Sequence, residues 1–495
     1  MNFADALQQV GPLDDEALDR LGGMLGEVDE KDALGAVTAL GRRVRLTARM
    51  DGRTRAQRWV SHESGPLRGH FVAASGAHSA LVDRFAAGER GPIVLVVASW
   101  ARYFGTRERA VNIMQAGFEI QYLPFLVLRT ADWAEPVRDA ARTIVSRRIG
   151  TPERLAAAVP MAVYVAGRDR GGWAIDTIRD RVRAEFDRFG PALLASRETY
   201  ARRLGFEIAR EQGRVDYAEQ VRRAGHDGDT IIRGWAAGAA RAEAVRRGDR
   251  KTLRSLARSR FAGVRVEALI GLVKLGHDDD LTAALDDGAA LVRAYARSRT
   301  TDAAAHYRVT VTTAPSPGSI AGLGETGVYA DAALLAPLLA SADAPLRAAA
   351  IRALAALDSM PVDDVLPLLR DPAPAVVREA ANALRFRRTP PELPWQLLAD
   401  PRPEVRRAGY RLTAARPRHE QLRAALLLAH DADPALARSG LSAAHRLLHG
   451  LGDNWWSRRR FPIPPDTHPE LIDLATRLGE PGARLAAGIR ATPPE

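Results

Sequence analysis

The sequence contains no cysteine, and only 6% of its residues are aromatic. Without thiols the chain forms neither disulfides nor thiolate sites, which fits a reducing compartment. No segment approaches the roughly twenty apolar residues that a membrane-spanning helix needs. The first residues, Met1 to Glu16, lack the basic cap and apolar core of a secretory signal peptide. We therefore expect a soluble, cytoplasmic protein that does not insert into a membrane.

Motifs of the common catalytic sites are also missing. The sequence has no phosphate-binding Gly-Lys-Ser/Thr loop, no Gly-x-Ser-x-Gly turn and no His-Glu-x-x-His pair. His62, Glu63, His70 and His78 lie close together in the sequence. They lack the i, i+4 spacing on a helix that a metal site of this kind uses. We therefore expect no cofactor and no bound metal, and we favour a non-catalytic role.

Basic charge exceeds acidic charge, giving a formal net charge of +11. Lys31, Lys251 and Lys274 are the only lysines, so arginine carries almost all of the positive charge. Such an excess is compatible with nucleic acid or another acidic partner. Acidic residues are interspersed among the arginines, which favours an ordinary solvated surface. The preference for arginine over lysine then reflects a GC-rich genome.

A repeated phrase dominates the sequence. An Asp and a Pro-containing turn precede a Val-Arg pair that opens an Ala-rich helix, as in Asp132 to Arg138 and Asp400 to Arg406. The spacing of about thirty residues is typical of helical hairpin repeats. Further copies begin at Ile232-Arg233, Val264-Arg265, Val292-Arg293 and Leu346-Arg347, whereas after Val376 and Leu436 the arginine comes one position later, as Arg378 and Arg438.

Residues 331–357 illustrate one unit. They predict a short first helix from Ala332 to Leu339, a turn with Pro345 at the start of the next helix, and a second helix from Leu346 to Leu357. One hairpin cannot bury its apolar face alone, so stacking on neighbouring units is expected.

The interval between Val292 and Leu346 is about twice the usual repeat spacing, and we call it the double step. We interpret it as an embellished unit with helices at Asp302 to Val311 and Ser319 to Glu325. The segment Gly322 to Gly327 matches a dinucleotide-binding motif by its letters, but no strand precedes it. We predict instead a helix end at which Gly327 supplies a left-handed cap.

These phrases resemble the HEAT-repeat superfamily, and in particular the PBS-lyase-type HEAT-like repeats common in bacteria. The resemblance is strong over 228–450 and good over 121–148. It implies an α-solenoid whose second helices line a concave face, and it implies no single activity. It also implies a structural Asp–Arg ladder between hairpins, for which Asp132 with Arg138, Asp343 with Arg347 and Asp400 with Arg406 are the expected pairs.

The predicted fold is therefore all-α, an α-solenoid of stacked hairpins with helical end caps. We expect four segments, which are an N-terminal helical cap over 1–91, divergent repeats over 92–228, HEAT-like repeats over 229–450, and a C-terminal lid and tail over 451–495.

The sequence favours a scaffold that binds a protein partner on the concave face. The sixth residue after each helix anchor is polar in an otherwise Ala- and Leu-rich helix, and we expect these positions to contact the partner: Arg352, Asn382, Arg411 and Ser442. The alternative is nucleic-acid binding, through Trp455, Trp456, Arg458, Arg459 and Arg460, which offer stacking and charge together. HEAT-like DNA glycosylases use a Trp and an Asp on a basic face, for which Trp133, Asp139, Trp173 and Asp176 are available.

Overall fold

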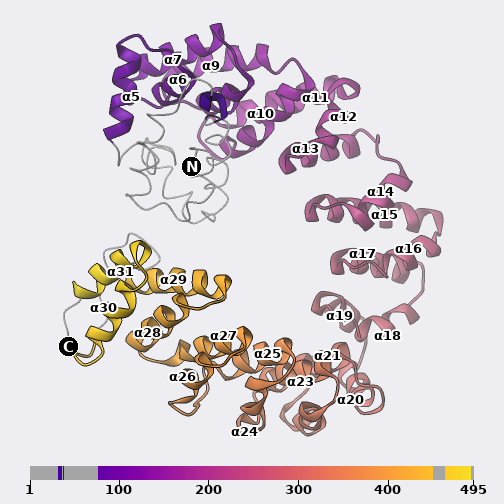
Figure 1. The fold of residues 1–495 in the computed structure, drawn as a ribbon. Helices are drawn as coiled ribbons and strands as arrows, with labels where there is room; N and C mark the ends of the chain where they lie inside the picture. Colours follow the sequence, from indigo (N-terminus) through magenta and orange to yellow (C-terminus); the bar gives the residue numbers. More distant parts are fainter. Residues whose placement is uncertain (1–31, 36, 38–75, 450–462, 492–495) are drawn as a thin grey trace. The chain divides into compact units, whose positions relative to one another are not determined.

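The computed structural model describes residues 32–35, 37, 76–449 and 463–491. Within these ranges the chain forms helices and turns and has no β-strand, so the expected all-α solenoid is confirmed. The chain divides into two compact units, residues 1–236 and 237–495, and the boundary falls inside α15 (Thr230–Arg247). Figure 1 shows helical hairpins following one another through each unit. The four segments expected from the sequence remain predictions.

The first unit stacks hairpins whose first helices, such as α8, lie in one layer and whose second helices, such as α9, lie in another. Its described helices are α5 (Gly76–Ala86), α6 (Pro92–Ala98), α7 (Phe104–Ala116), η2 (Ile120–Tyr122), α8 (Leu123–Arg129), α9 (Glu135–Arg148), α10 (Pro152–Val165), α11 (Gly172–Ala184), α12 (Phe186–Ala195), α13 (Thr199–Glu211) and α14 (Tyr217–His226).

The second unit repeats this two-layer arrangement, and its second helices pack against one another in sequence order from α17 to α27. Its described helices are α16 (Arg250–Leu256), α17 (Ala262–Lys274), α18 (Asp279–Leu285), α19 (Ala290–Arg297), α20 (Ala303–Thr313), α21 (Pro317–Thr326), η3 (Tyr329–Asp331), α22 (Ala332–Leu335), η4 (Ala336–Ala340), α23 (Ala344–Ala356), α24 (Val362–Val365), η5 (Pro367–Arg370), α25 (Pro374–Leu384), α26 (Leu393–Leu398), α27 (Pro403–Leu412), η6 (Thr413–Ala415), α28 (Arg418–Ala429), α29 (Pro434–His449), α30 (His468–Thr476) and α31 (Glu480–Arg490).

The hairpin that ends in α23 shows why the sequence folds this way. Pro345 stands in the first turn of α23, where its missing N–H costs nothing. Buried alanines at 348, 349, 350 and 353 let this helix approach its neighbours closely. The first helix differs from its expected form, because α22 ends at Leu335 and a 3₁₀ segment continues to Ala340. Pro337 lies in that segment and cannot donate the hydrogen bond of a continuing α-helix.

The double step contains one complete hairpin, α20 and α21, and α21 packs between α19 and α23. Its glycines serve close packing. A Cβ on Gly322 would stand 2.2 Å from the Tyr307 ring, and one on Gly324 would stand 2.6 Å from Cα of Ala353. The prediction of a left-handed cap at Gly327 is wrong, because its φ is −73°. Glycine is needed there because a Cβ would lie 2.6 Å from the carbonyl oxygen of Leu323.

Arginine forks connect consecutive hairpins. Arg347 donates from Nη1 to the carbonyl oxygen of Ser341 in its own turn, and from Nε and Nη2 to both carboxylate oxygens of Asp371 in the next hairpin, at 2.8 Å each. Asp371 also accepts the backbone N–H of Ala373. Equivalent forks join Arg107 to Asp132, Arg265 to Asp287 and Arg406 to Asp431. Each arginine thus fixes its own turn and the next hairpin at once.

The expected Asp–Arg pairs were therefore wrong in their register, although a ladder exists. Arg138 and Arg406 bind the backbone carbonyls of Asp132 and Asp400, not their carboxylates. Arg347 forks onto Asp371 rather than Asp343. The physical reason is reach, because a second-helix arginine points toward the next turn in the stack. Bidentate guanidinium–carboxylate geometry then holds that turn in place.

The C-terminal end of the second unit carries a further hairpin. Helices α30 and α31 pack on α28 and α29, and Ile463, Leu471, Leu485 and Ile489 are buried in the shared core. Leu441, Leu447 and Leu448 pack against this core from α29. The last repeat is therefore covered by helices from the segment that the sequence predicted to be a lid.

The glycines of α21 generate a first prediction. Gly324→Ala should lower the free energy of unfolding by about 1–3 kcal/mol, because the new methyl group would overlap the backbone of α23. Gly263→Ala on α17 meets no atom within 4 Å and should be neutral or stabilising by up to about 1 kcal/mol. Denaturant unfolding followed by circular dichroism would compare the two. Equal stabilities would contradict the packing role.

The arginine ladder generates a second prediction. Asp371→Ala should destabilise the second unit by about 2–4 kcal/mol, because it leaves the Arg347 fork without its buried carboxylate. Asp343→Ala should cost less than about 0.5 kcal/mol, because that aspartate is exposed and takes no fork. The matched pair distinguishes the two registers in the same melting experiment. A larger loss at Asp343 would restore the pairing within one hairpin.

Candidate partner-binding face

Most arginines directly after the helix anchors are engaged within the chain and cannot hold a partner. Arg265, Arg347 and Arg406 fork onto aspartates, whereas Arg293 joins Glu325 on α21. Burial of Glu325 opposes its ionisation, but the hydrogen bonds and charges of Arg293 and Arg297 still lower its pKa. Arg406 donates a hydrogen bond to the carboxylate of Asp431 and thereby lowers the pKa of Asp431. These carboxylates are charged, satisfied and structural.

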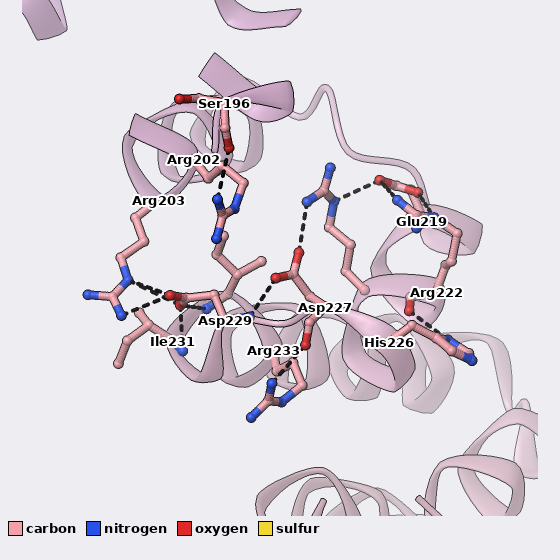
Figure 2. A network of polar contacts seen from close by, with 12 residues as sticks. Ser196, Arg202, Arg203, Glu219, Arg222, His226, Asp227, Asp229, Ile231 and Arg233 are labelled. Atoms are coloured by element: carbon pink, nitrogen blue, oxygen red, sulfur yellow. Dashed lines mark hydrogen bonds and ion pairs between the residues drawn. The ribbon is translucent and has the colours of Figure 1, made fainter. Parts of the chain in front are cut away.

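The first unit contains a denser version of the same arrangement, shown in Figure 2. Arg202 donates to the carbonyl oxygen of Ser196, while Arg203 makes the fork to Asp229. Arg223 bridges Glu219 and Asp227 with ion pairs at 2.7 and 3.0 Å. This network links α13, α14 and the start of α15, and each of its three carboxylates is paired with an arginine. We therefore assign it a structural role.

A different set of arginines points away from the ladder in the second unit. We call it the arginine face, and it lies on three second helices. Its members are Arg378 of α25 and Arg385 directly after that helix, Arg407 and Arg411 of α27, and Arg438 and Arg446 of α29. Arg411 is half-buried and the other five are exposed. Only Arg378 forms an ion pair among the described residues, with Glu379 at 3.0 Å.

The four residues predicted to contact a partner occupy the same helices and the adjoining α23. Arg352, Asn382 and Ser442 are exposed, and Arg411 is half-buried. Asn382 lies between Arg378 and Arg385 at helical spacing. Ser442 accepts a hydrogen bond from Arg446 at 2.9 Å. The sequence analysis missed Arg378, Arg385, Arg407, Arg438 and Arg446 as candidates, although the one-position shift of Arg378 and Arg438 was visible in the repeat alignment.

Arg411 has an unusual electrostatic environment. Its partial burial, together with the positive charges of Arg407, Arg378 and Arg385, lowers the pKa of its guanidinium. Glu379 opposes this effect but is already paired with Arg378. A cation that is half-desolvated among like charges is stabilised by an added anion. This part of the surface is therefore suited to binding negative charge.

The first unit has a second cationic region, near the turn between α8 and α9. Burial lowers the pKa of Arg129 to about 10. The positive charges of Arg107 and Arg168 act in the same direction, and the negative charge of Asp132 opposes them. Trp133 is 55% exposed, and its ring centre lies 5.3 Å from the Arg107 guanidinium. This region combines an exposed indole with clustered positive charge.

The other residues considered for a glycosylase site are placed differently. Trp173 is half-buried and stacks with Arg142 at 5.2 Å. Asp139 is exposed and lies 3.8 Å from Arg138, and Asp176 is exposed on α11. Among the described residues, neither of these two carboxylates contacts Trp133. The aspartate next to Trp133 is Asp132, and its carboxylate is held by Arg107 and Arg129.

Several candidate residues lie outside the part of the chain that the structure describes. These are Trp455, Trp456, Arg458, Arg459 and Arg460, and also His62, Glu63 and His70 of the histidine cluster, with the side chain of His78. Among the described residues, no group of three or more His, Cys, Asp or Glu side chains could hold a metal ion. No helix in the described ranges is long and apolar enough to span a membrane.

Comparison with solved structures returned large helical proteins at low similarity. An engineered protein is 15% identical over the whole of both chains, with a TM-score of 0.18. A structure of Kap95p, whose binding induces the switch loops of RanGDP to adopt the GTP-bound conformation, is 11% identical over 98% of this chain, with a TM-score of 0.25. Kap121p is 12% identical over 95% of this chain, with a TM-score of 0.26. The chain spans 66% of the first of these two proteins and 57% of the second.

No curated protein gave a significant match. The HEAT-repeat family matches residues 332–408, which contain α23, α25 and most of α27. That stretch includes two of the four predicted contact residues, Arg352 and Asn382, and three members of the arginine face, Arg378, Arg385 and Arg407. The narrower assignment to PBS-lyase-type repeats remains a prediction. Stacked hairpins and arginine forks extend beyond the matched stretch, so the described residues form an α-solenoid that contains HEAT repeats over 332–408.

Proposed function

We propose that the chain is a non-catalytic cytoplasmic scaffold that binds a protein partner on the concave, second-helix face of residues 344–449. Arg352, Asn382, Arg411 and Ser442 would contact the partner. The observation that carries this proposal is the row of polar side chains on α23, α25, α27 and α29 that are accessible and outside the ladder.

The energetics of the repeat support this reading. Exposed arginines contribute little to folding when they lack a carboxylate partner, and several together repel one another. The forks at Arg347 and Arg406 already connect the hairpins. Arg352 and Arg407 therefore have no evident structural task. Repeat arrays present long, shallow surfaces that suit extended protein partners.

Site-specific crosslinking would test where the partner binds. A photoreactive amino acid at Asn382 or Ser442 should form adducts in native cells, because both positions are exposed on second helices. The matched control is Gln396, which is exposed on the first helix α26. Arg352→Glu with Arg411→Glu should abolish the adducts and leave the melting temperature unchanged. Adducts only at Gln396 would place the partner on the other layer and contradict the proposal.

Nucleic-acid binding is a second candidate, supported by the cationic region around Trp133 in the first unit. Exposed aromatic rings beside arginine stack on unpaired bases, and clustered guanidinium groups bind phosphates. Trp133 supplies the exposed ring, whereas Arg107 beside it is buried and forked onto Asp132. The HEAT-like glycosylase version would additionally require a catalytic carboxylate near the indole.

Gel-shift titration at two salt concentrations tests this candidate. If it is correct, a single-stranded oligonucleotide should bind with an affinity that falls steeply with salt, because phosphate contacts release counterions. Trp133→Ala should weaken binding by about 1–3 kcal/mol through lost stacking. Tyr329→Ala, at an exposed aromatic in the second unit, is the control. Absence of a shift at low salt would remove the candidate, and excision of an alkylated base would favour the glycosylase version.

A further inference from the structure

The arginine face consists of three short stripes. Arg378, Asn382 and Arg385 follow one another at i, i+4 and i+7 along α25 and its end. Arg407 and Arg411 are separated by one turn of α27, and Arg438, Ser442 and Arg446 by successive turns of α29. Residues three or four apart lie on the same side of a helix. Each helix therefore presents one row of positive charge.

The first two stripes lie side by side, because helices α25 and α27 pack directly against one another. The positive charges of Arg378 and Arg385 on α25 accordingly help to lower the pKa of Arg411 on α27. Helix α28 contacts both α27 and α29, so the third stripe lies on the next second helix of the array. The stripes of α25 and α27 therefore form one cationic surface, and the stripe of α29 follows it.

Most of the negative charge near this surface is already engaged, and the exception is Glu404, which lies three residues before Arg407 on α27 and forms no ion pair among the described residues. Glu379 is buried beside Arg378 and pairs with it. Asp431 accepts the Arg406 fork, and Asp400 faces Arg370 and Arg402 at 3.8 and 3.7 Å. Among the described residues, Arg385, Arg407, Arg411, Arg438 and Arg446 form no ion pair. An external anion would supply the missing carboxylates.

We propose, building on the binding function above, that the arginine face binds an acidic polypeptide segment rich in Asp and Glu. Carboxylates of the segment would accept fork hydrogen bonds from Arg407 and Arg411, with Arg378 and Arg385 on one side and Arg438 and Arg446 on the other. Planar guanidinium groups match carboxylates with two parallel hydrogen bonds, which gives this pairing both strength and direction.

The dimensions favour a peptide over nucleic acid. The distance from Arg378 to Arg385 along α25 is about 10 Å at 1.5 Å per residue. Three helices have two spacings of about 8–10 Å, so the surface extends about 16–20 Å across them. An extended chain of about eight residues would cover that length. A specific protein–DNA interface needs roughly 1,000 Å² or more, which is several times this area.

The side chains also favour a peptide. Single-stranded nucleic acids are held by successive aromatic rings on which bases stack. Within α25, α27 and α29, no exposed aromatic side chain lies on the described surface, since Tyr410 is half-buried in the core. Phe386 follows α25, is exposed, and lies 4.5 Å from the Arg385 guanidinium. One such ring at the edge suits an apolar residue within an acidic segment.

Fluorescence anisotropy with the full chain would test the inference. The probe is a labelled peptide of eight glutamates, compared with eight lysines and with an eight-nucleotide oligothymidylate. We expect the glutamate peptide to bind best of the three. Arg407→Gln with Arg411→Gln should weaken it at least about tenfold, because two charge-assisted forks are lost. Arg258→Gln with Arg260→Gln should change it less than about twofold, since these exposed arginines lie on the turn before α17.

Two further variants keep the result interpretable. Arg407→Lys with Arg411→Lys retains both charges but loses the forks, and it should give intermediate affinity. Thermal melts of every variant must match the parent chain, and if the Gln pair fails to fold, the Lys pair and Arg438→Gln with Arg446→Gln take its place. Equal losses from the face variant and the control variant would overturn the inference, because net charge alone would then explain binding.

The nucleotide probe distinguishes the remaining outcomes. Tighter binding of oligothymidylate than of the glutamate peptide, with the same dependence on Arg407 and Arg411, would overturn the inference and make this face a nucleic-acid surface. Adducts from Asn382 or Ser442 with a partner whose contacting segment is neutral or basic would leave the scaffold function standing and refute the acidic segment. If the parent chain forms no adducts from Asn382 or Ser442, that result would count against the scaffold function itself.

Discussion

The array depends on the guanidinium fork that reaches from one hairpin to the next. In this geometry a single side chain satisfies carbonyl oxygens in its own turn and a buried carboxylate in the following one, as Arg406 does with Asp400 and Asp431. Buried charges are costly unless they are paired and hydrogen-bonded. Each fork therefore fixes the register between neighbouring units more specifically than alanine packing could.

Where the fork is absent, other residues replace it. In α25 the position after the anchor is the buried Val377, and no arginine there reaches the carbonyls of the turn. Arg402 from the following turn donates to the carbonyl oxygens of Asp371 and Arg370 instead. In the double step, Glu325 of α21 takes the place of the turn aspartate for Arg293 and Arg297. An arginine holds each of these two junctions, through backbone carbonyl oxygens in one and through a carboxylate in the other.

Sequence periodicity was sufficient to predict the hairpins and their approximate bounds, and the family resemblance implied an Asp–Arg ladder. It could not give the partner of each arginine, because a pair such as Arg347 and Asp371 depends on how hairpins stack. The role of Gly327 was misjudged for the same reason, since its constraint comes from nearby atoms and not from a left-handed φ. A lid over 451–495 was expected, but α30 and α31 were not delimited within it because their sequence lacks the repeated Val-Arg phrase. For the candidate site, Arg352, Asn382 and Ser442 are exposed and their contact with a partner stays a prediction, whereas the clustering around Arg411 depends on distances between helices.

A shift of one residue separates the structural arginines from those available to a partner. One position along an α-helix corresponds to a rotation of about 100°. In α27 both positions are occupied by arginine. Arg406 turns into the stack and meets Asp431, while Arg407 faces solvent. In α25 and α29 only the later position is arginine, and Arg378 and Arg438 are exposed. Because the later position takes no part in the forks of α27, its charge can vary without breaking the stack. The same repeat therefore supports one mode of assembly and a surface whose chemistry is set independently.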